Sequence, residues 1–68
     1  TVAVHAFNLA VALDRMRNYG PARRYYEAAL ALSVRQGGER VSSVPHGVVE
    51  TRLGQLRAAP KADTVNAD

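Results

Sequence analysis

Residues 2–36 decide the fold, and they read VAVHAFNLAVALDRMRNYGPARRYYEAALALSVRQ. Apolar residues recur at three- and four-residue spacings on both sides of a break at 18–21, Asn-Tyr-Gly-Pro. This spacing is typical of amphipathic helices, and proline suits a first helical turn because its missing N–H had no partner there. We therefore predict an all-α fold with helices over 2–16 and 20–36.

The first predicted helix is apolar over most of its circumference, which is typical of a helix packed between neighbours. Two stripes make up this apolar cover: Val2, Ala6, Leu9, Leu13 and Met16 in one, and Val4, Phe7 and Val11 in the other. In the second helix we expect Ala22, Tyr26, Ala29 and Leu30 on the packed side.

Downstream of the hairpin, Gly37-Gly38 predicts a helix end, because glycine adopts the left-handed conformation without steric cost. We expect a polar loop over 37–44, with Ser42 and Ser43 as candidate helix caps. A third helix over 45–58 should then pack through a narrow stripe and expose its charged residues. The stripe is Val49, Leu53 and Leu56, and the charged residues are Glu50, Arg52 and Arg57. Residues 60–68 have no periodicity, which predicts a disordered tail.

The length and composition restrict the function classes. A chain of 68 residues forms one small domain, and its net charge of +3 comes from nine Lys and Arg against six Asp and Glu. Because there is no cysteine, disulfides, zinc–thiolate sites and thiol nucleophiles are excluded. Neither a membrane-spanning run nor a signal peptide is recognisable in this segment.

Residues 3–36 resemble one tetratricopeptide repeat, a helical hairpin of about 34 residues with the signature W-x2-L-G-x2-Y, then A-x3-F, then P. The signature positions match in register without insertion, and we expect them to pack the hairpin: Leu9, Ala10, Leu13, Ala22, Tyr26, Ala29 and Leu30. Three positions depart from the pattern: Ala6 replaces Trp, Arg17 stands where a turn Gly is common, and Val34 replaces Pro.

The resemblance implies a domain organisation. The pair Leu53-Gly54 echoes the Leu-Gly of the repeat but comes 44 residues after Leu9, so 45–58 is expected to be a capping helix that closes a stack. Residues 1–59 would then form one three-helix module (hairpin 2–36, capping helix 45–58), excised from a longer repeat array. A single hairpin with a cap falls below the roughly three repeats that such arrays need for stability.

The phrase at 8–14, Asn-Leu-Ala-Val-Ala-Leu-Asp, is also similar to the C-terminal region of bacterial repeat proteins of pilus biogenesis and secretion, of the MSHA and tight-adherence type. This resemblance implies a non-catalytic scaffold that binds proteins. It would act in the bacterial cytoplasm or on the periplasmic side of an envelope machine.

In this family the first helix of each hairpin lines the concave surface. By resemblance, the partner-binding residues would be Val4, Phe7, Val11, Asp14 and Arg15. The same apolar residues would alternatively pack in the core or mediate self-association through the first helix. Exposed contiguous apolar surface of this kind usually marks an interface.

Catalysis, cofactor binding and metal binding are not expected. His5 and His46 lie on different helices, and the serines lack a nucleophile-elbow context such as G-x-S-x-G. Nucleic-acid binding by a small basic module is the alternative function, because four arginines surround the first turn: Arg15, Arg17, Arg23 and Arg24. A helix-turn-helix reader needs a turn of about 3–4 residues before its recognition helix, whereas the connection expected over 37–44 is longer, which favours protein binding.

Overall fold

A computed structural model describes residues 2–58, and its regular structure is entirely helical, which confirms the all-α prediction. The helices are α1 (Val2–Arg15), α2 (Tyr19–Arg35), α3 (Glu39–Ser42) and α4 (His46–Ala58). The tail predicted over 60–68 lies outside the described residues. Within the described range, no helix is long and apolar enough to cross a membrane.

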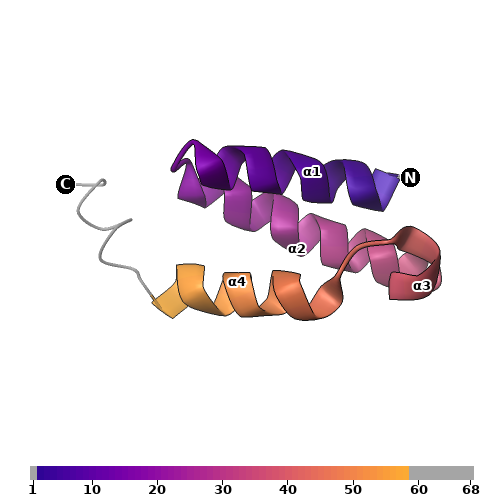
Figure 1. Cartoon of the computed structure of the whole chain (residues 1–68). Coiled ribbons are helices and arrows are strands. Elements are labelled where there is room, and N and C mark those ends of the chain that lie inside the picture. The colour runs from indigo at the N-terminus through magenta and orange to yellow at the C-terminus, as the bar shows by residue number, and fades with distance from the viewer. Residues whose placement is uncertain (1, 59–68) are drawn as a thin grey trace.

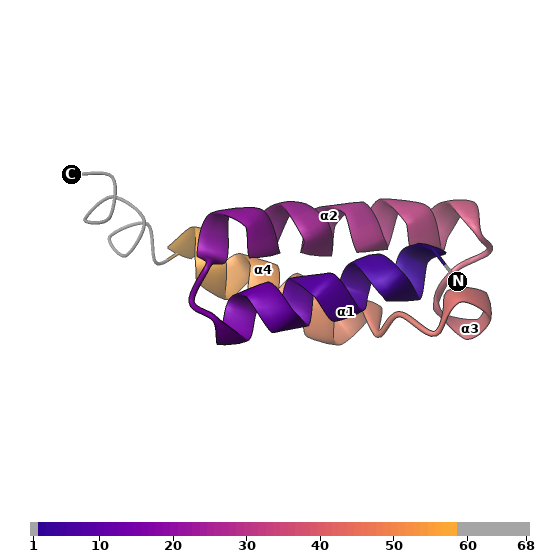
Figure 2. The ribbon, with the colours of Figure 1, turned by 90° about the horizontal axis from the view of Figure 1, so that it is seen from above.

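The helices α1 and α2 form an antiparallel hairpin, and α4 packs against α2 (Figure 1). Seen from above, α4 runs beneath the hairpin in the same direction as α1 (Figure 2). The α1–α2 turn and the end of α4 therefore lie at one end of the molecule, and α3 lies at the other.

Small residues make the contact between α1 and α2. Alanine side chains are buried on both helices, which lets the two backbones approach closely. Tyr26 is the one large side chain among them, and it is buried as expected. The buried alanines are Ala3, Ala6 and Ala10 on α1 and Ala22 and Ala29 on α2.

The predicted buried stripe of α1 is wrong in its larger members. Val2, Leu9 and Met16 are 64%, 38% and 70% exposed, and Leu13 is only half-buried. The physical reason is that α2 takes the alanine face of α1, so the bulkier residues remain on an edge that no described element covers. Leu30, expected on the packed side of α2, is half-buried as well.

Both helices of the hairpin end with the same hydrogen-bond pattern. Asn18 N–H donates to the Leu13 carbonyl at 2.9 Å, and Arg17 N–H donates to the Asp14 carbonyl at 2.9 Å. At the end of α2, Gly38 and Gly37 repeat these bonds. Such a cap requires a positive φ, which is 62° at Arg17 and 109° at Gly37.

The segment predicted as a polar loop instead contains α3 and two buried residues. Val44 is fully buried, and Ser42 turns inward. Ser33 Oγ lies 2.5 Å from both Ser42 Oγ and His46 Nε2, so these hydroxyls join the end of α2 to the start of α4. The predicted serine cap of α4 is also replaced, because Glu39 Oε1 accepts the His46 N–H.

The apolar stripe of α4 is buried as predicted: Val49, Leu53 and Leu56. A glycine of the repeat's Leu-Gly pair would lie where two helices pack closely, and Gly54 does not lie at such a contact. It is exposed, and a Cβ built there would meet nothing within 4 Å. The likeness of Leu53-Gly54 to the repeat pair therefore does not extend to packing.

Candidate protein-binding groove

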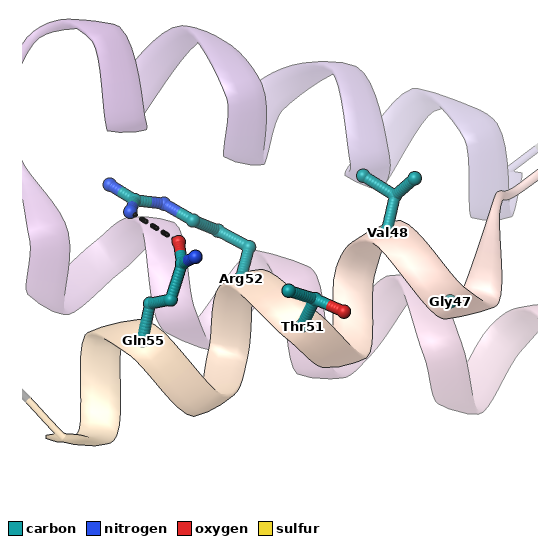
Figure 3. Close-up of a pocket in the computed structure, with 5 residues that line it drawn as sticks. All are labelled: Gly47, Val48, Thr51, Arg52 and Gln55. Atoms are coloured by element: carbon teal, nitrogen blue, oxygen red, sulfur yellow. Dashed lines mark hydrogen bonds between the residues drawn. The ribbon is translucent and has the colours of Figure 1, made fainter.

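A shallow, open groove of about 630 Å³ lies on α4, and all the residues that line it belong to this helix (Figure 3). Its lining residues are mostly three or four positions apart in sequence, so they lie on one face of the helix. Figure 3 shows Val48 and Arg52 projecting from α4 toward α1. The lining residues are Gly47, Val48, Thr51, Arg52 and Gln55.

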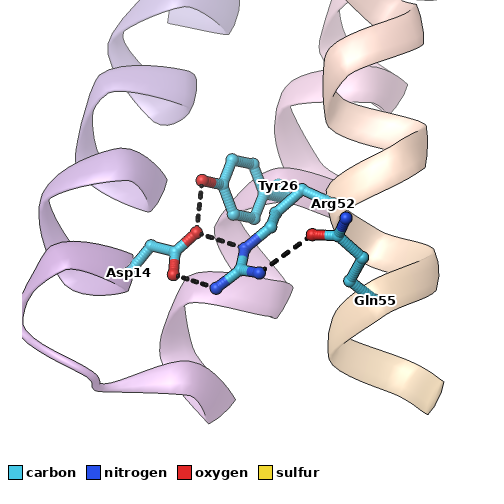
Figure 4. A network of polar contacts seen from close by, with 4 residues as sticks. All are labelled: Asp14, Tyr26, Arg52 and Gln55. Atoms are coloured by element: carbon cyan, nitrogen blue, oxygen red, sulfur yellow. Dashed lines mark hydrogen bonds and ion pairs between the residues drawn. The ribbon is translucent and has the colours of Figure 1, made fainter. Parts of the chain in front are cut away.

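Arg52 connects this groove to α1 (Figure 4). Its Nε donates to Asp14 Oδ2 at 2.8 Å, and its Nη2 donates to Asp14 Oδ1 at 2.7 Å. The Tyr26 hydroxyl donates to the same Oδ2 at 2.8 Å. The Asp14 and Arg52 side chains are only 14% and 34% exposed, so this ion pair is shielded from bulk water. The prediction that Arg52 faces water is therefore wrong.

The cluster shifts the ionisation of its members. The hydrogen bond from Arg52 lowers the pKa of Asp14 below its usual 3.8, and it raises the pKa of Arg52. Burial, with the hydrogen bond to Asp14, raises the pKa of Tyr26 to about 12. At neutral pH the cluster is therefore a carboxylate held by a guanidinium and a neutral phenol.

All three nitrogen atoms of the Arg52 guanidinium donate hydrogen bonds within the chain. Beyond its bonds to Asp14, its Nη1 donates to Gln55 Oε1 at 3.0 Å, and its Cζ lies 5.9 Å from the centre of the Tyr19 ring. What the groove offers a ligand is therefore the aliphatic surface of Val48, the hydroxyl of Thr51 and the amide of Gln55. These groups suit a peptide and supply neither a nucleophile nor a free cation for phosphate.

The residues predicted to bind a partner are only partly available. Val4, Phe7 and Val11 are half-buried against the core, and the Phe7 ring lies 6.3 Å from the Tyr26 ring. Asp14 is occupied by Arg52 and Tyr26, because a shielded carboxylate needs a cation and donors. Arg15 is exposed. None of the five is among the residues that line the groove.

The groove residues of α4 were not predicted from the sequence. One signal was present, since Gly47, Thr51 and Gln55 recur at four-residue spacing opposite the stripe of Val49, Leu53 and Leu56. That signal cannot show that Val48 and Arg52, at the edge of this face, project toward α1.

Residues 2–58 contain no group of three or more histidine, aspartate or glutamate side chains that could hold a metal ion. Ser33 is fully buried, so its contact with His46 joins two helices rather than presenting a nucleophile. His5 is exposed on α1.

A second ion pair joins α4 to the hairpin, between Arg57 Nη2 and Glu27 Oε2 at 2.7 Å. It replaces the pairing of Glu27 with Arg23 that helical spacing suggests. Asp14 and Glu27 are the only carboxylates of residues 2–36, so both acidic side chains of the hairpin are paired with arginines of α4. The arginines of the hairpin take part in neither of these pairs.

Comparisons of the chain with family models, with curated proteins and with solved structures found no match.

Proposed function

We propose that the chain is a non-catalytic protein-interaction module of the tetratricopeptide type, whose groove on α4 receives a segment of a partner protein. The observation that carries this proposal is the open groove on α4, whose one charged side chain, Arg52, is paired with Asp14. The resemblance of residues 8–14 suggests a bacterial pilus-assembly or secretion machine as the setting.

The packing of the hairpin supports the repeat assignment. Ala10 and Ala22 are fully buried at the close contact, and Tyr26 fills the space between them and the cluster at Asp14.

Protein binding fits the groove better than nucleic-acid binding does. Phosphate recognition needs cationic side chains that are not already paired with carboxylates of the same protein. The one arginine of the groove, Arg52, donates two hydrogen bonds to Asp14 from the Nε–Nη2 edge of its guanidinium. A peptide with an apolar anchor, by contrast, can cover Val48 and hydrogen-bond to Thr51 or Gln55.

A peptide-display library tests the proposal. We expect selected peptides to share an apolar anchor and to bind the chain with an affinity that Val48→Glu lowers at least tenfold. Val34→Glu is the matched control, because Val48 and Val34 are 62% and 67% exposed but Val34 does not line the groove.

Two results would overturn this function. One is that no peptide is enriched over a blank support. The other is that a labelled single-stranded oligonucleotide binds instead, losing affinity at least tenfold between 50 and 200 mM salt as phosphate contacts do (about 10³-fold for six contacts).

A further inference from the structure

The edge of the hairpin that faces away from α4 is apolar and uncovered. Val2 and Leu9 on α1 and Met16 directly after it are spaced by seven residues, and the Met16 N–H still donates to the Ala12 carbonyl, which places the three on one line. At about 100° per residue they lie about 120–160° round α1 from Asp14, which faces α4. They therefore lie on the side of the hairpin opposite α4.

The second helix continues this surface. Tyr25 and Leu32 are also seven residues apart and lie about 140–160° round α2 from Glu27, which pairs with α4. Tyr25 is exposed, and Leu32 is half-buried. We call this surface the open flank: Val2, Leu9, Met16, Tyr25 and Leu32.

The charge around the open flank has one sign. Arg24 and Arg35 lie on one line of α2 between the open flank and Glu27, about 60–100° round from Tyr25 and Leu32, and both are exposed. Arg17 is exposed in the turn at one end. No carboxylate of the hairpin balances them, since Asp14 and Glu27 are held by α4 on the other side.

The docking of α4 shows how a helix binds this hairpin. It places an apolar stripe against α2 and two arginines against the two carboxylates. The open flank presents the opposite charge, and we propose that it docks an amphipathic helix of a partner protein that carries acidic residues beside its apolar stripe. A second copy of the chain fits less well, because its own open flank brings arginines and no free carboxylate.

This surface is separate from the groove, so it can be tested with designed probes. The first probe is a labelled helical peptide of about 18 residues, long enough to span α1, with a leucine and alanine stripe flanked by glutamates. The second has lysine in place of each glutamate. We expect the chain to bind the glutamate peptide at least tenfold more tightly in fluorescence anisotropy.

Variants locate the binding. Met16→Glu should weaken binding of the glutamate peptide at least tenfold, whereas Val34→Glu should change it less than twofold, although both residues are highly exposed at 70% and 67%. The double variant Arg24→Glu/Arg35→Glu should reverse the preference toward the lysine peptide. Val48→Glu, which tests the groove, should leave this binding unchanged.

The proposal is overturned if both peptides bind equally or if neither binds at millimolar concentration. It is also overturned if sedimentation shows a dimer of the chain that Met16→Glu dissociates, because the occupant is then a second copy. None of these results bears on the proposed groove, because peptide selection and its loss in Val48→Glu are measured independently.

Discussion

Arg52 of α4 donates two hydrogen bonds, of 2.8 and 2.7 Å, to the carboxylate of Asp14 on α1, which lies 38 residues earlier in the sequence. Of the two ion pairs that join α4 to the hairpin, this one is the more shielded from water. It also fixes the face of α4 that turns toward α1, and so it positions the groove.

A double-mutant cycle measures what this pair contributes. We expect Asp14→Asn and Arg52→Gln to couple by about 1–2 kcal/mol in urea unfolding, between the values for exposed and for fully buried pairs. The cycle Glu27→Gln with Arg57→Gln is the control. Its side chains are 45% and 59% exposed, so a coupling of about 0–1 kcal/mol is expected. Equal couplings would show that shielding does not distinguish the pairs.

The pH dependence of stability follows from the same cluster. Because the folded-state pKa of Asp14 lies below its usual 3.8, its contribution is complete above about pH 4 and is lost as the pH falls through the lowered pKa. At the alkaline end, the pKa of Tyr26 is raised from 10.0 to about 12, so stability is lost as the pH rises from 10 through 12. Circular dichroism at fixed urea checks both limbs.

Two variants test which residue causes the loss of stability at each end of the pH range. Asp14→Asn should flatten the acid limb, and Tyr26→Phe should flatten the alkaline one. An acid limb that persists unchanged in Asp14→Asn would place the responsible carboxylate elsewhere.

Arg17→Gly should stabilise the chain. Arg17 adopts a φ of 62° in the cap that ends α1, a conformation that costs a non-glycine residue about 1–2 kcal/mol. The matched change Gly37→Ala should destabilise, because Gly37 has a φ of 109° and its new Cβ would lie 3.1 Å from Val41 Cγ2. Thermal unfolding measures both, and a lower melting temperature for Arg17→Gly would show that its side chain contributes more than its strain costs.

Ala10→Leu and Ala29→Leu should each destabilise by about 1–3 kcal/mol, since both alanines are fully buried where α1 meets α2. Ala12→Leu is the control, because Ala12 is exposed on the same helix. If the buried substitutions left the unfolding transition unchanged, the close helix contact that supports the repeat assignment would not exist.

The sequence predicted the three long helices well because their signals are local, and it missed the short α3. The end of α2 at Gly37-Gly38 and the break before Pro21 each depend on the conformation of one or two residues. The prediction of the buried face of α1 was wrong because it gave more weight to the large apolar residues Leu9 and Met16 than to the small alanines that pack against α2.

The candidate site was harder to predict, because it depends on contacts between distant residues. Nothing near Arg52 in the sequence identifies Asp14 as its partner, and nothing near Val44 shows that a loop residue is fully buried. The groove face of α4 becomes visible only when these contacts orient the helix.

Mapping a display-selected peptide onto the isotope-labelled chain by NMR tests the central claim most directly. Our account predicts that the largest amide shifts fall on Val48, Thr51 and Gln55 of α4, with helical content unchanged. Shifts centred instead on the arginines of the α1–α2 turn, with Val48 and Thr51 unmoved, would contradict a protein-binding groove on α4.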